Sequence, residues 1–120
     1  MKINLLDKKF APFLDKYANW NGLKSIAISF DIDWAPDYMI KNVINILNNY
    51  TVNSTFFVTH NSQVIQDTNE DQIELASHLY ISNDSSQGSN IEKVIEKLRR
   101  WYPNKKIDGN RFHLLSHSYR

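Results

Sequence analysis

Four polar side chains could carry chemistry in this chain, because each one follows a short apolar stretch at the point where that stretch ends. They are Asp31, Asp33, His60 and His78. Two aspartates spaced i and i+2 can divide two tasks, since one can bind a divalent metal while the other takes a proton from metal-bound water. An imidazole from a neighbouring stretch can complete part of the coordination. The set predicts hydrolysis of an amide or an ester, with zinc or another divalent metal as cofactor.

The apolar stretches before these side chains have the character of buried strands. Residues 25–30 (SIAISF) and 54–59 (STFFVT) are short runs rich in β-branched and aromatic residues, and residues 73–77 form a third, weaker run. Runs of this length that end at polar residues are typical of strands covered on both faces. A fourth strand is expected near 106–107 or 111–114.

Helices are expected between the strands. Pro36 suits the first turn of one helix, and Asn90 can cap a second helix that Pro103 would follow. A short helix is expected between the second and third strands. The apolar stripe of the first helix is Ile40, Val43, Ile44 and Leu47, and that of the second is Ile91, Val94, Ile95, Leu98 and Trp101.

This alternation of strands and helices predicts an α/β fold with a mainly parallel sheet and right-handed crossovers. The carboxyl ends of parallel strands share one edge of the sheet, where functional sites are built. Asp31, Asp33, His60 and His78 are therefore expected to converge. A length of 120 residues suits one core. We expect a helical or docking segment over 1–23 and the domain over 24–120.

The bulk composition excludes several classes of protein. The 14 basic residues nearly balance the 13 acidic ones, so no strong field recruits nucleic acid. The chain has no cysteine, which excludes disulfides and thiolate metal sites. Charges at Asp7, Lys8 and Lys9 interrupt any apolar signal sequence, and no segment has the roughly 18 apolar residues of a membrane span. These features predict a cytoplasmic protein.

Each candidate side chain also has an ordinary structural interpretation. An Asp-x-Asp after a strand often only begins a loop, and His60 could cap the turn that follows it. His78 could be a loop histidine with satisfied hydrogen bonds, and His113 lies in an apolar tail whose register is not readable. Trp34 could face a sugar ring or pack over the sheet edge. In the functional interpretation Trp34, His60 and His113 contact the substrate.

Residues 27–60 (AISFDIDWAPDYMIKNVINILNNYTVNSTFFVTH) carry two motifs that resemble a known family. The stretch is similar to the opening of the polysaccharide deacetylase family, the NodB-homology domain of carbohydrate esterase family 4. It resembles most a divergent branch found in surface-polysaccharide (O-antigen) biosynthesis clusters. In that branch the first motif is Phe-Asp-x-Asp-Trp-Ala, and the second strand reads Ala-Thr-Phe-Phe-Val-Thr-His.

The resemblance implies a distorted (β/α) barrel that removes N- or O-acyl groups from a carbohydrate with a bound metal. Asp31 matches the catalytic base, Asp33 the metal-binding aspartate, and His78 the first metal histidine. Arg111, in 109–113 (GNRFH), matches an arginine that orients the base, although 115–118 can be aligned to the same motif.

The chain departs from the family pattern in two respects. The second metal histidine is expected at position 82 or in a Ser-Ser-His-Gly loop, but the chain has Ser82 and the loop reads SSQG, so Gln87 takes the ligand position. An amide oxygen is a poorer zinc ligand than an imidazole, and Asp84 is an alternative donor.

The second departure is length, because family domains are much longer than this chain. We expect the first half of a barrel, truncated or split, whose open edge favours self-association or a missing C-terminal half.

Two other functions fit part of the pattern. A phosphatase of the haloacid dehalogenase type also places Asp-x-Asp after its first strand, but follows the pair with Gly-Thr, where this chain has Trp34 and Ala35. A catalytically inactive deacetylase remnant, or a sugar-binding partner, would explain both Gln87 and the absent later strands. The metal content of the purified chain separates these hypotheses.

Overall fold

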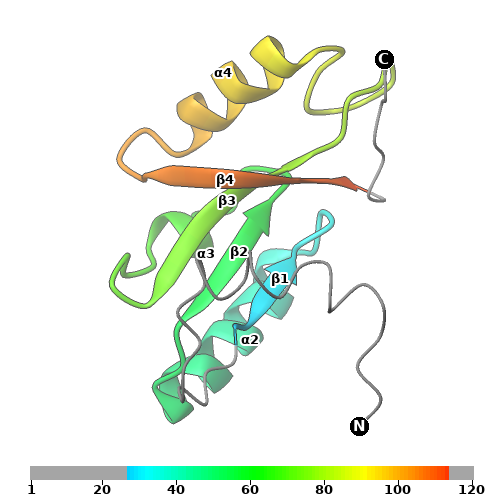
Figure 1. Cartoon of the computed structure of the whole chain (residues 1–120). Coiled ribbons are helices and arrows are strands. Elements are labelled where there is room, and N and C mark those ends of the chain that lie inside the picture. Colours follow the sequence, from blue (N-terminus) through cyan, green and yellow to red (C-terminus); the bar gives the residue numbers. More distant parts are fainter. Residues whose placement is uncertain (1–26, 114–120) are drawn as a thin grey trace, which may run out of the picture.

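The structure is a computed structural model that describes residues 27–113, so the segment predicted over 1–23 lies outside the described residues. Strands and helices alternate along this range (Figure 1). The strands are β1 (Ser29–Asp31), β2 (Ser54–Val58), β3 (Ile73–Leu79) and β4 (Ile107–Phe112). The helices are α2 (Asp37–Tyr50), α3 (Gln63–Gln66) and α4 (Ile91–Trp101).

The four strands form one sheet in the order β1-β2-β3-β4, and each pair is parallel. The predicted α/β fold with a parallel sheet is therefore confirmed. Each strand pairs with the next one in the sequence, which is the order that the first half of a (β/α) barrel would have. The fourth strand occupies 107–112, so it begins in the first predicted range, 106–107, and ends in the second, 111–114.

The helices pack on one face of the sheet. Phe56 and Val58 of β2 and Leu75 of β3 point to this face and are buried in the core together with residues of α2, α3 and α4. The prediction for α4 holds at its start, since the Asn90 side chain accepts a hydrogen bond from the Lys93 N–H at 2.9 Å. The predicted helix stripes are buried only in part: Ile40, Ile44, Leu47, Val94 and Leu98 are buried, Val43 and Trp101 are partly buried, and Ile91 and Ile95 are exposed.

The opposite face of the sheet carries Asp31, His78 and Arg111. Asp31 is in register with Phe57, and His78 is in register with Arg111. Side chains alternate between the two faces along a strand. Asp31, Phe57, His78 and Arg111 therefore all lie on the face away from the helices. The sheet thus separates an apolar core from the groups that could do chemistry.

Candidate functional site

A tight turn after β1 places Asp33. The backbone φ angles of Asp33 and Trp34 are 36° and 60°, and the Ala35 N–H donates to the Ile32 carbonyl at 2.6 Å. Two positive φ angles inside one closed turn are typical of type I′ geometry, which a tryptophan rarely adopts. The Thr59 hydroxyl accepts a hydrogen bond from the Trp34 N–H at 3.0 Å and so fixes the turn to the end of β2.

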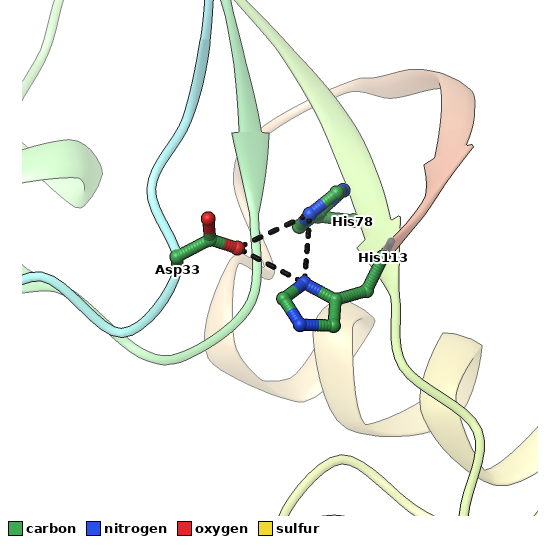
Figure 2. Close-up of side chains that lie close together, drawn as sticks. All are labelled: Asp33, His78 and His113. Atoms are coloured by element: carbon green, nitrogen blue, oxygen red, sulfur yellow. Dashed lines mark hydrogen bonds and ion pairs between the residues drawn. The ribbon is translucent and has the colours of Figure 1, made fainter. Parts of the chain in front are cut away.

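Three donor atoms meet at the carboxyl ends of β1, β3 and β4 (Figure 2). The Oδ1 atom of Asp33 lies 3.2 Å from Nε2 of His78 and 3.1 Å from Nδ1 of His113. The two imidazole nitrogens are 3.2 Å apart. The donor atoms therefore form a nearly equilateral triangle.

The size of this triangle fits one metal ion. Ligand atoms about 2.1 Å from a common ion lie about 3.0 Å apart at octahedral angles and about 3.4 Å apart at tetrahedral angles. The observed sides of 3.1 to 3.2 Å fall between these two values. One carboxylate and two imidazoles also form a mixed oxygen and nitrogen set that zinc and several other divalent metals accept.

The orientation of His78 supports the same assignment. Its Nδ1 lies 3.0 Å from the Arg111 carbonyl oxygen, which can only accept, so Nδ1 carries the proton. In the neutral imidazole the other nitrogen, Nε2, then presents a lone pair to the carboxylate oxygen of Asp33. Two facing lone pairs repel each other unless a metal ion or a proton lies near them. Metal-binding histidines are commonly held by such a contact to a carbonyl.

A second pair lies on the same face of the sheet. Nη1 of Arg111 donates to Oδ1 of Asp31 at 2.7 Å, and Nη2 donates to the Ser29 hydroxyl at 3.1 Å. The Arg111 and Asp31 side chains are each one-third exposed, so the pair is open to solvent on one side.

Aromatic rings stand beside the triangle. Trp34 and Tyr80 meet edge to face at 5.8 Å between ring centroids, and each also meets the His113 ring edge to face, at 5.5 and 5.1 Å. The indole N–H of Trp34 donates to the Ser86 hydroxyl at 3.1 Å, which fixes the ring although 36% of the residue is exposed. This arrangement gives the site an apolar wall.

Gln87, which was predicted to be a metal ligand, has a different set of contacts. Its amide oxygen accepts from the Tyr80 N–H at 2.8 Å, and its amide nitrogen donates to the carbonyls of Thr59 and His78 at 2.9 and 2.8 Å. The side chain is buried and links the ends of β2 and β3. Backbone groups thus occupy both ends of the amide, and the donor atom found beside Asp33 and His78 belongs to His113.

His60 also stays outside the triangle of donor atoms. Its Nδ1 lies 3.0 Å from the Thr59 hydroxyl, and burial lowers the pKa of its imidazole, while Asp37 and the Ala35 carbonyl act in the opposite direction. Its backbone carbonyl accepts from the Tyr102 hydroxyl at 2.6 Å. These contacts favour the structural interpretation of His60 over contact with a substrate.

The sequence holds one signal for the position of His113 that the predicted ligand set leaves out. His113 stands two residues after Arg111, so a strand running through both would direct them to the same face. Without the register of β4, this spacing could not show that His113 reaches Asp33.

Comparisons with known proteins show the family and the fold of the chain. Residues 28–119 match a family model described as WbmS-like polysaccharide deacetylase. The fold is similar, with a TM-score of 0.56 and 20% identity, to the crystal structure of a proposed polysaccharide deacetylase involved in O-antigen biosynthesis from Bordetella bronchiseptica. The match covers 76% of this chain and 38% of that one. No curated protein matches. Within residues 27–113, no helix is long and apolar enough to cross a membrane.

Proposed function

The chain belongs to the family of WbmS-like polysaccharide deacetylases, and from this premise we propose that it binds a divalent metal through Asp33, His78 and His113 and removes acyl groups from a carbohydrate. The triangle of donor atoms, 3.1 to 3.2 Å on each side, is the observation that carries the proposal. Zinc is the metal we propose, because it accepts one carboxylate and two imidazoles without a change of oxidation state.

A bound metal at this position would polarise the acyl carbonyl and acidify a water molecule. The remaining steps use the chain's own groups. Asp31 accepts the proton of the attacking water, and Arg111 holds the Asp31 carboxylate in place through the 2.7 Å contact. The Arg111 carbonyl also holds the His78 ring, so one residue orients both the base and a metal ligand.

The aromatic wall supplies the contact with the sugar in this proposal. Pyranose rings present C–H groups that pack well on aromatic faces. Of the two aromatic side chains beside the triangle, Trp34 is more exposed than Tyr80. The hydrogen bond from its indole N–H to Ser86 fixes the ring before substrate arrives. Pre-organisation of this kind lowers the entropic cost of binding.

The first test is the metal content of the purified chain. We expect about one equivalent of zinc in the parent and its loss in Asp33→Ala, His78→Ala and His113→Ala. His60→Gln and Asp84→Ala serve as controls that keep the metal. A folded parent that fails to bind any divalent metal would reject the proposed site.

A second candidate function is sugar binding without turnover. It is favoured by the aromatic wall, whose 36% exposed Trp34 can pack against a sugar without a bound metal. Release of acetate from an acetylated amino sugar by the zinc-loaded chain would decide for hydrolysis, and binding of that sugar without release would decide for the alternative. Neither comparison points to a phosphatase.

A further inference from the structure

A ring lies beneath the Arg111–Asp31 pair. The guanidinium carbon of Arg111 is 3.9 Å from the centroid of the Phe57 ring, on the face of the sheet that carries the site. From this geometry we propose that Phe57 is a positioning residue, which holds the Arg111 guanidinium against Asp31. The effect on hydrolysis rests on the function proposed above, but the effect on Arg111 itself does not.

Arg111 has to cross the sheet to reach Asp31. It lies on β4 and Asp31 lies on β1, with β2 and β3 between them. Three strand spacings amount to about 14 Å along a sheet. The contact therefore needs a long side chain as well as a sheet that curls toward this face. A long side chain loses much rotamer freedom when its end is fixed, so a surface that guides it makes the contact more favourable.

Phe57 provides that surface because β2 places its ring beside the carboxylate. Asp31 and Phe57 are partners in the register of β1 and β2. A guanidinium packed over a ring can still donate its N–H groups to hydrogen-bond acceptors beside the ring. Nη1 and Nη2 donate in this way to Asp31 and Ser29, two residues that point the same way from β1.

The neighbouring residue supplies a matched control. Phe56 is adjacent to Phe57 on β2, but its side chain points into the core, where it is 1% exposed and lies 5.1 Å from the Phe30 ring. Replacement of either ring by leucine removes the same atoms from the same strand. Only the loss of Phe57 removes a ring from beneath the guanidinium.

The first measurement is an NMR spectrum of the full, ¹⁵N-labelled chain without metal, so its result is independent of the proposed metal site. The Nε–Hε signal of Arg111 is identified by its absence from Arg111→Lys. A ring close to the guanidinium moves this proton signal upfield. We expect Phe57→Leu to abolish the upfield shift, and Phe57→Tyr and Phe56→Leu to keep it. An upfield shift that survives in Phe57→Leu would overturn the proposal.

The second measurement is the hydrolysis of an acetylated amino sugar by the zinc-loaded chain. We expect Phe57→Leu to lower kcat by roughly 2- to 30-fold, the range of a cation–π contact, with KM and bound zinc unchanged. Phe57→Tyr should restore kcat. Equal losses in Phe57→Leu and Phe57→Tyr would also overturn the proposal. An inactive parent with the expected NMR shifts would reject the proposed function and leave the positioning role intact.

Discussion

At the scale of single residues, the Gln87 amide bonds to two buried backbone groups and one partly buried backbone group. The Gln87 side chain bonds to the Tyr80 N–H and to the carbonyls of Thr59 and His78, and these contacts hold the ends of β2 and β3 together. A buried backbone group without a partner costs about 1 to 3 kcal/mol. Gln87 therefore has a structural role that depends on the two N–H donors and the one oxygen acceptor of its amide.

Gln87→His tests this role directly. If Gln87 were a poor substitute for a metal ligand, an imidazole in its place would raise metal affinity. We expect no gain in affinity and a fall of about 1 to 3 kcal/mol in the free energy of unfolding, because an imidazole cannot serve all three backbone groups. Zinc titration and urea unfolding of the two proteins provide the measurement. A tighter zinc complex in the variant would restore Gln87 to the ligand set.

At the scale of elements, the end of α4 is joined to the loop after β2. Tyr102, the residue that follows α4, donates its hydroxyl to the His60 carbonyl at 2.6 Å and accepts from the Ser62 N–H at 3.1 Å. Ser62 in turn caps α3 and donates its hydroxyl to Asp37 at the start of α2. One tyrosine thus connects α2, α3 and α4 to the edge of the sheet that carries the site. Burial raises its pKa to about 12, so the hydroxyl keeps its proton at neutral pH.

Tyr102→Phe should lower the free energy of unfolding by about 1 to 3 kcal/mol, because the His60 carbonyl and the Ser62 N–H lose a buried partner. Tyr50→Phe is the matched control, since Tyr50 is 76% exposed at the end of α2. Its effect should stay within about 0.5 kcal/mol. Chemical denaturation of the parent and both variants measures the difference. Equal effects at the two positions would argue against the connecting role of Tyr102.

At the scale of the whole molecule, the sheet divides the domain into two unlike sides. Its helical side is an apolar core, and its other side carries Asp31, His78 and Arg111 at the strand ends. This division separates the requirements of folding from those of the site. A partly buried titratable group, such as His60 just after β2, can make the stability of the whole domain depend on pH.

Stability should fall as the pH drops below neutrality, in part because of His60. Burial lowers the pKa of His60 in the folded chain from its ordinary value of 6.5. Between the folded pKa and 6.5 the unfolded chain binds more protons, so acid favours unfolding in that window and the effect levels off below it. We expect His60→Gln to show a smaller loss of stability from pH 7 to 5 than the parent. Thermal unfolding across this range tests it, and parallel curves would contradict it.

The sequence alone predicted the order of the elements, but not their bounds. β1 was expected over 25–30 and lies at 29–31, and β3 was expected over 73–77 and lies at 73–79. Asp31 and His78 therefore stand within the last residues of their strands rather than after them.

Short apolar runs ending in polar residues predicted β1, β2 and β3, and Asn90 predicted the start of α4, because these signals are local. A parallel sheet then placed Asp31, Asp33 and His78 at one edge. The motifs around Asp31 and the end of β2 also identified the family, which the match over residues 28–119 confirmed.

Only the tertiary structure decided which side chains meet. His113 joins Asp33 because the register of β4 directs it there, and Gln87 is drawn into the interior by backbone groups that spacing alone does not reveal. Arg111 reaches Asp31 across the whole width of the sheet. Such contacts depend on strand register and sheet curvature, which arise from the packing of distant parts of the chain and leave no local pattern in the sequence.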